Sequence, residues 1–360
     1  MKYLYLALLF LLPILSIGQK VDLDRYNFTV QVRTLPLMRL DSSYHTYNVV
    51  VEGTKLMQTY LQDMDPEKSV IVDGWKSLST TGHITFRIKL EDLLPESVSV
   101  KERVENIKDK TGKITGTRIF YYQEVVYTFA ALAQINDYKG EHIMDIVLAD
   151  RGHKQTYKSP EFPIRQVAEG YFMINALSVT GNLYKSCVTR AMHTLSNQAS
   201  NNFGYSEATI SDFMWILDSR KHPEYTAHRE AFQQITEVLF TFNASQSIDG
   251  VREKLQPVIN YFEKIKKTYT STKKYDRKLR YASYFNLAVL YYYLDDPQSM
   301  LKEAKGLVMN DYDANDGRVF ENSALRLKNL FQSAKIYTRH FPIDPTTFKG
   351  PYETEVTKNK

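Results

Sequence analysis

The sequence predicts a mixed two-domain protein, with an antiparallel β-sandwich at residues 19–165 and an α-helical domain at residues 166–340. Three observations lead to this fold class. The chain has 360 residues, and single hydrophobic cores stop growing at about 250–300 residues. Its 43% hydrophobic and 24% charged residues are typical of globular proteins. The hydrophobic period is two up to about Phe162 and 3.6 beyond Pro163.

Residues 1–18 are expected to be a secretory signal peptide and to lie outside the fold. Lys2 supplies a positive charge, the stretch from Tyr3 to Ile17 is apolar, and Ser16 and Gly18 are small residues at the −3 and −1 positions of a cleavage site. The apolar core is too short for a stop-transfer helix. We therefore expect an exported protein, most readily periplasmic and otherwise extracellular, that does not span a membrane after cleavage. An N-terminal membrane anchor is the alternative.

The β-domain is predicted from strict alternation of apolar and polar residues. Tyr26–Arg33 and Ile84–Leu90 alternate most clearly, as half-buried antiparallel strands do. Gly112 and Gly140 each end a turn sequence that separates strands. Further strands are predicted at Thr46–Glu52, Ser69–Asp73, Ser97–Arg103, Thr117–Gln134, His142–Ala149 and Gln155–Ser159. The Thr117–Gln134 run exceeds a usual strand, so we expect a bend or bulge within it.

The second domain is predicted from segments with the period of an amphipathic helix. Asp249-Gly250 precedes one helix, and Asp295-Asp296-Pro297 places Pro at the first position of another. The predicted helices are Asn182–Ser200, Ser206–Ser219, Tyr225–Phe242, Ile248–Lys267, Lys274–Leu294, Pro297–Met309 and Asp316–His340. Residues 341–360 hold several Pro and polar residues and are expected to form a flexible tail.

One stretch of about thirty residues, from Tyr284 to Leu307, resembles a tetratricopeptide repeat. The residues that match this helical hairpin in order are Tyr284, Leu287, Ala288, Tyr291, Met300, Ala304 and Leu307. Met300 stands where the family usually has Ala, and Asp295 where its turn usually has Gly. Because one repeat cannot bury its own apolar face, the resemblance implies a short helical array with a protein-binding surface. An ordinary helical bundle is the alternative.

A basic segment precedes this motif. Arg252–Arg280 holds ten Lys and Arg against three acidic residues. Such a segment is typical of a solvated helix face, or of a surface that attracts an acidic partner or an anionic polymer. The residues expected to bind the partner are Lys264, Lys266, Lys267, Lys273, Lys274, Lys278 and Arg280. Export argues against nucleic acid as the ligand.

Motifs for catalysis or metal binding are weak in this sequence. The run Asp311–Gly317 resembles a calcium loop, but Asp316 stands where that loop requires Gly. His222 and His228 are separated by Pro223, which breaks helical ligand spacing. The single Cys187 excludes a disulfide within the chain and is expected to be a small buried residue, with a reactive thiol as the alternative. We therefore expect no metal, no cofactor and no enzymatic activity.

These features favour an exported, non-catalytic scaffold or adaptor that binds another protein of the cell envelope. The signal ending Ser16-Ile-Gly-Gln and the Lys-, Tyr- and Asn-rich composition resemble exported proteins of the Bacteroidota. By analogy, such a protein could serve as an accessory periplasmic subunit of an outer-membrane secretion or assembly machine. The alternatives are a glycan- or peptidoglycan-binding module, and a hydrolase whose site is not visible in the sequence.

Overall fold

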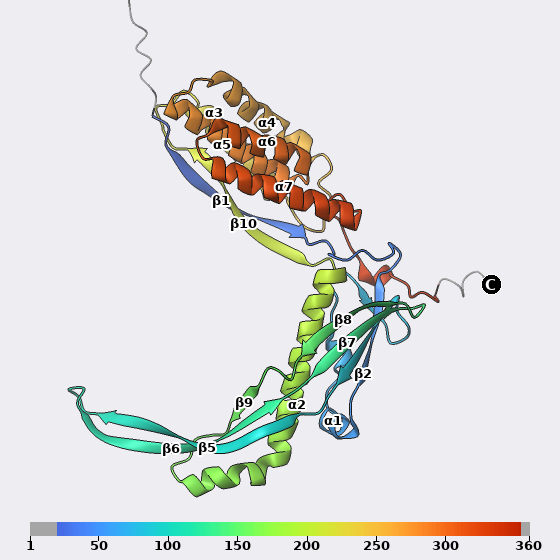
Figure 1. Cartoon of the computed structure of the whole chain (residues 1–360). Coiled ribbons are helices and arrows are strands. Elements are labelled where there is room, and N and C mark those ends of the chain that lie inside the picture. The colour runs from blue at the N-terminus through green and yellow to red at the C-terminus, as the bar shows by residue number, and fades with distance from the viewer. Residues whose placement is uncertain (1–19, 354–360) are drawn as a thin grey trace, which may run out of the picture. The chain divides into compact units, whose positions relative to one another are not determined.

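The computed structural model describes residues 20–353, which form two compact units. The helical unit contains the described residues up to Leu37 together with Glu207–Ile343, and the sheet unit contains Met38–Ser206 and the described residues from Asp344. The predicted division at residue 165 therefore differs from the one that the contacts give. The first strand belongs with the helices, and the first long helix belongs with the sheets (Figure 1). The predicted signal peptide lies outside the described residues.

The sheet unit holds two sheets. A five-stranded sheet has the order β3-β2-β4-β7-β8, and a three-stranded sheet has the order β5-β6-β9. Strand β2 runs parallel to β3 and β4, and all other pairs in this unit are antiparallel. The strands are β2 (Thr46–Glu52), β3 (Lys76–Ser77), β4 (Ile84–Leu90), β5 (Leu94–Lys108), β6 (Ile114–Thr128), β7 (Ala131–Asp137), β8 (His142–Ala149) and β9 (Gln155–Lys158).

Most of the predicted strands are confirmed, including the turns at Gly112 and Gly140, which both have positive φ angles. The long Thr117–Gln134 run is broken at Phe129 and Ala130, so that it belongs partly to β6 and partly to β7. The strand predicted at Ser69–Asp73 is wrong: this segment follows the short 3₁₀ helix η1 (Glu67–Ser69). There Val70 and Val72 are buried without pairing in a sheet.

Helix α2 (Arg165–Phe203) packs against the five-stranded sheet, where the sandwich prediction expected a second sheet. Its Tyr184, Val188 and Leu195 belong to the same buried cluster as Phe86 and Ile88 of β4. The short helix α1 (Lys55–Tyr60) contributes Met57 to this cluster. A long amphipathic helix can therefore supply the apolar surface that the sheet face requires.

Cys187 lies on the sheet-facing side of α2 and is 2% exposed, which confirms its predicted burial. Burial raises the pKa of its thiol, although Arg190 beside it acts in the opposite direction.

The helical unit combines a two-stranded antiparallel ribbon with five helices in succession. The ribbon pairs β1 (Leu23–Arg33) with β10 (Glu207–Leu217) over its whole length. The helices are α3 (Tyr225–Leu239), α4 (Val251–Thr268), α5 (Lys274–Tyr293), α6 (Pro297–Asn310) and α7 (Ala314–Ala334). Consecutive helices contact one another from α3 to α7.

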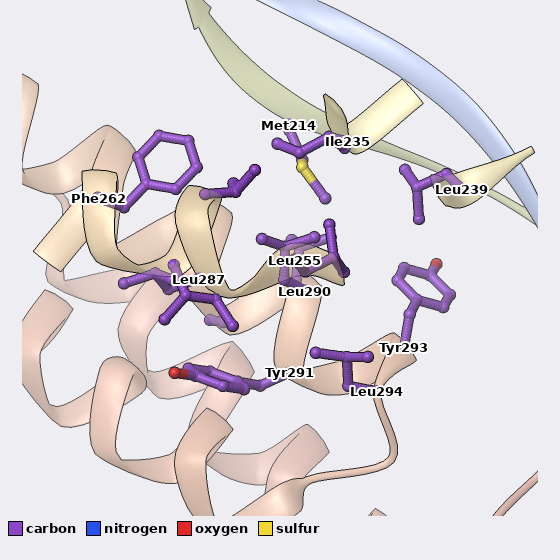
Figure 2. Close-up of a cluster of buried hydrophobic side chains, with 14 of the residues drawn as sticks. Met214, Ile235, Leu239, Leu255, Phe262, Leu287, Leu290, Tyr291, Tyr293 and Leu294 are labelled. Atoms are coloured by element: carbon purple, nitrogen blue, oxygen red, sulfur yellow. The ribbon is translucent and has the colours of Figure 1, made fainter. Parts of the chain in front are cut away.

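The helix predicted at Ser206–Ser219 is wrong, because this segment is the strand β10. Met214, which lies opposite Tyr26 in the register with β1, and Ile216 are buried in the same cluster as Val30 and Val32 of β1. Figure 2 shows Met214 near Ile235 of helix α3 within this core. The ribbon thus forms one wall of the helical core.

The turn between α5 and α6 is fixed by three side chains. Asp295 has a φ of 56°, and its carboxylate accepts hydrogen bonds from the backbone N–H of Arg339 at 2.6 Å and from the Arg339 Nε at 2.7 Å. Asp296 caps α6 by accepting from the backbone N–H of Ser299. The ion pair with Arg339 therefore holds the turn in a left-handed conformation that Gly would adopt at lower cost.

The segment predicted to be a flexible tail makes contacts in each unit. In the helical unit, Phe341 accepts a hydrogen bond from Nε of Arg33 at 2.9 Å. In the sheet unit, Phe348 stacks on His45, and its carbonyl accepts from Nζ of Lys76 at 2.8 Å. None of the helices within residues 20–353 is both long and apolar enough to cross a membrane.

Gly317 allows α7 to approach α6 closely. A Cβ atom at this position would lie 2.7 Å from Cγ2 of Val308 and 2.9 Å from the carbonyl oxygen of Ala304, so part of the obstacle is backbone that cannot rotate away. We expect Gly317→Ala to lower the free energy of unfolding of the helical unit by about 1–3 kcal/mol. Urea unfolding followed by Trp215 fluorescence in a Trp75→Phe background measures this value. Gly170 of α2 has open space at its Cβ, so Gly170→Ala should stabilise the sheet unit by up to about 1 kcal/mol, measured by Trp75 fluorescence in a Trp215→Phe background. Equal effects of the two substitutions would contradict the close packing.

His228 should make the helical unit sensitive to acid. Its side chain is fully buried, and Nε2 lies 3.3 Å from the carbonyl oxygen of Trp215. Burial lowers the pKa of His228 to about 4, whereas in the unfolded chain the pKa is about 6.5. The unfolded state therefore binds more protons between these values, and stability falls as the pH falls through this window. We expect a loss of about 2–3 kcal/mol between pH 7 and pH 4 that His228→Phe removes. An unchanged pH profile in that variant would contradict this assignment.

Candidate functional site

The residues of the repeat motif lie on the hairpin of α5 and α6, and most of them are core residues. Six of the seven are at most 7% exposed: Leu287, Ala288, Tyr291, Met300, Ala304 and Leu307. Their role in the structure is to pack α5 and α6 together and onto neighbouring helices. They therefore position a surface but are not part of it.

Tyr284 is the exception, because its half-buried ring faces a pocket between α4, α5 and α6. The ring rests on Gly306 of α6, where a Cβ atom would lie 2.2 Å from Cε1 of the tyrosine. The ammonium of Lys266 lies 4.6 Å from the ring centroid, within the range of a cation–π contact. Tyr284 thus forms one wall of the pocket.

The pocket has a volume of about 610 Å³ and is bordered by four lysines and two glutamates. Lys266 and Glu263 come from α4, and Glu303 comes from α6. The other three lysines, Lys267, Lys302 and Lys305, are exposed. We call this feature the lysine groove.

The floor of the lysine groove is a buried ion-pair triad. Nζ of Lys266 donates to Glu263 Oε1 at 2.9 Å and to Glu303 Oε2 at 2.5 Å. The side chain of Lys266 is 6% exposed and that of Glu303 is 0% exposed. Glu303 Oε1 has no hydrogen-bond partner among the described residues, and Nζ of Lys302 lies 3.8 Å from it. Satisfying this buried oxygen would require a further donor.

Lys266 lowers the pKa of both glutamates, but the net pKa shifts of the two are opposite. Burial raises the pKa of Glu303 and outweighs the attraction of Lys266. Burial also acts on Glu263, but the hydrogen bond and charge of Lys266, with Lys302 and Lys267 nearby, lower its pKa overall. Glu263 is therefore the main counter-charge of Lys266. The exposed lysines Lys267, Lys302 and Lys305 make the rim of the groove positive.

The predicted partner-binding residues do not form one cluster. Of the seven, only Lys266 and Lys267 border the groove. Arg280 is a structural residue, because its guanidinium donates to the carbonyls of Tyr269 and Ser271 and to Oδ1 of Asn310. Four others are exposed or half-buried and do not border the groove: Lys264, Lys273, Lys274 and Lys278. The sequence prediction of partner-binding residues did not include Lys302 and Lys305, which also border the groove. Their spacing of three residues on a predicted helix places both side chains on one face, and this is the signal that could have identified them.

The residues considered for metal binding serve other roles in the structure. Asp313 caps α7, and Asp316 accepts a hydrogen bond from the hydroxyl of Tyr281 at 2.5 Å. His228 lies in the core, stacked on Phe232. Within residues 20–353, no three His, Cys, Asp or Glu side chains are placed to hold a metal ion together.

No protein-family model matches this sequence, and no curated protein is significantly similar to it.

Removing the cation at the centre of the triad should be strongly destabilising. Lys266→Met leaves Glu303 buried without its hydrogen-bonded partner, and we expect a loss of about 3–5 kcal/mol at pH 7.5. Because the pKa of Glu303 is raised, its protonation should reduce this loss as the pH falls toward 5. Urea unfolding followed by Trp215 fluorescence at both pH values measures the effect.

The exposed neighbour provides the control for this variant. Lys267→Met should change stability by less than about 0.5 kcal/mol. Combining Lys266→Met with Glu303→Leu should recover most of the loss, because the fully buried carboxylate is then gone and Glu263 still has Lys302 at 3.7 Å. If Lys266→Met were no more destabilising than Lys267→Met, the triad would not be an important interaction.

Proposed function

We propose that this protein is an exported, non-catalytic adaptor that binds an acidic segment of another envelope protein in the lysine groove. The observation that carries the proposal is the convergence of four lysines from α4 and α6 on one pocket. Three of them are exposed at its rim, where a carboxylate can reach them, although Lys302 also lies 3.7 Å from Glu263. Rim charges of one sign accelerate encounter with an oppositely charged surface and select against partners of like charge.

The architecture of the groove supports binding rather than chemistry. Lys266 is held by two glutamates and by the face of Tyr284, so the floor of the groove is rigid before a partner arrives. A preorganised site loses less side-chain entropy on binding. The resemblance of Tyr284–Leu307 to a tetratricopeptide repeat adds support, since such helical arrays present protein-binding surfaces.

Export and envelope location are proposed from the N-terminal sequence, whose residues lie outside the described part of the chain. If the host is one of the Bacteroidota, an accessory periplasmic subunit of an outer-membrane secretion or assembly machine is the role that we propose by analogy.

The glycan-binding alternative would be favoured by exposed aromatic side chains gathered on a sheet face. The most exposed aromatic residues among positions 20–353 are Phe240, Tyr275, Tyr337 and Tyr352, and none of them lies in a strand. Aromatic residues of β6 are instead covered by cations: Arg103 lies over Phe120, and Lys158 over Tyr122. The protein-binding proposal therefore has more support.

Reversing two charges of the groove should abolish partner capture. We expect Lys267→Glu combined with Lys305→Glu to reduce recovery of the partner at least about tenfold in affinity purification of the tagged protein from envelope extracts. Neither lysine has an ion-pair partner among the described residues, so the fold should be retained. Recovery from wild type should also fall steeply with added salt.

The matched control is Lys254→Glu combined with Lys328→Glu. Both lysines are exposed on the helical unit, do not border the groove and produce the same change of net charge. This variant should capture the partner as well as wild type does. The proposal fails if wild type recovers no stable partner, or if the two double variants recover it equally.

A further inference from the structure

In each strand of the β1–β10 ribbon, one set of backbone N–H and C=O groups pairs with the other strand, and the alternate set points away from it. At Trp215 of β10, the backbone N–H donates to Oδ1 of Asn286 and the carbonyl accepts from its Nδ2, both at 2.8 Å. The backbone groups of Trp215 therefore point away from β1. Its register partner Arg25 must then also direct its backbone groups away from the ribbon, because opposed residues in an antiparallel pair behave alike.

Alternation extends this assignment along β1. Every second residue from Arg25 directs its N–H and C=O outward, which includes Asn27, Thr29 and Gln31. The far end confirms the phase: the backbone N–H of Arg33 donates to the carbonyl of Arg339 at 2.8 Å rather than to β10. Between these ends, the outward groups of Asn27, Thr29 and Gln31 have no hydrogen-bond partner within residues 20–353.

This open edge lacks the usual protection against pairing. Natural edge strands are commonly blocked by Lys, Pro, a bulge or a covering segment. From Tyr26 to Val32 the strand carries no charged residue and no Pro, and the register with β10 is regular. Asn27, Thr29 and Gln31 are exposed, so no described segment covers them.

A pocket of about 510 Å³ adjoins the open edge. Asn27 and Thr29 belong both to the edge and to the pocket lining, which also includes Phe28, Leu239 and Phe240. Phe240 is 85% exposed at the C-terminal end of α3. The volume of this pocket is in the range of pockets that hold a small ligand or a large side chain.

We propose that the outer edge of β1 is a strand-addition site that binds an extended, uncharged segment of a partner protein, with an apolar or aromatic side chain in the adjoining pocket. The backbone groups of Asn27, Thr29 and Gln31 supply main-chain hydrogen bonds, and the pocket supplies side-chain selectivity. This surface is separate from the lysine groove, and the inference does not rest on the proposed function.

The length of the open edge and the absence of charge along it indicate which kind of partner segment can bind there. Five residues of strand span about 17 Å, so two copies of the chain that paired their β1 edges would bury far less than the roughly 1,200 Å² of a stable interface. A flexible peptide segment needs only this short edge and the pocket. The one carboxylate of the pocket lining, Asp212, already accepts a hydrogen bond from the hydroxyl of Tyr293 at 2.9 Å. An uncharged segment therefore complements the site.

Selection from a phage-displayed library of random ten-residue peptides on the whole exported chain, residues 19–360, tests the proposal. We expect enriched peptides to alternate uncharged polar with apolar or aromatic residues. As synthetic peptides, they should bind with an affinity that falls at least about tenfold in Thr29→Pro. Pro removes an outward N–H that no ladder bond uses, so the ribbon itself is retained.

Thr209→Pro is the matched control. Thr209 opposes Gln31 in the register, so its backbone groups also point outward, and it does not line the pocket. The variant therefore places Pro at an equivalent position of β10. It should leave peptide binding unchanged, whereas Phe240→Ala, at an exposed side chain, should weaken it. The proposal would be overturned if the peptides bound wild type and Thr29→Pro equally, or if only Thr209→Pro lost peptide binding. Selection that enriched no peptide would also overturn it. A dimer in sedimentation that Thr29→Pro dissociates would also overturn it, in favour of self-pairing.

Discussion

The pairing of β1 with β10 is the interaction on which the helical unit depends. Eleven register pairs join residues 23–33 to residues 207–217, and residues 38–206 of the sheet unit lie between them in the sequence. The inward residues Val30 and Met214 close one side of the core that helices α3, α4 and α5 build. Closing so long a loop is slow, because its entropy is lost before the contacts form. The intervening sheet unit has its own core, and its folding would shorten the effective loop.

A strand of the sheet unit could be predicted most directly where it buries one face only: the residues of β4 are buried at every second position along the whole strand, which gives a clear period of two. Strand β10 could not, because Phe213 and Trp215 on its other face are apolar as well and obscure the alternation. Its conformation is decided by a partner strand far away in the sequence. The sandwich prediction likewise assumed that a sheet covers a sheet, whereas the apolar face of α2 provides that cover.

The lysine groove was predictable only in part, for a related reason. The basic composition of Arg252–Arg280 pointed to Lys266 and Lys267, and the repeat motif pointed to Tyr284. The groove also requires Lys302 and Lys305, which the packing of α6 against α4 and α5 brings to the same place. Composition counts charges along the chain, but a binding surface gathers them across helices. Arg280 shows the converse, since a charge within the basic segment is used to hold a loop.

Cys187 has a practical consequence for spectroscopy. The native chain carries one thiol, and this thiol is 2% exposed with a raised pKa. Because the thiolate is the reactive form, maleimide reagents near neutral pH should spare it while the fold is intact. A second cysteine introduced on the surface of either unit can therefore carry a fluorophore or spin label at a single defined position. The wild-type sequence is in effect already a cysteine-silent background for distance and mobility measurements.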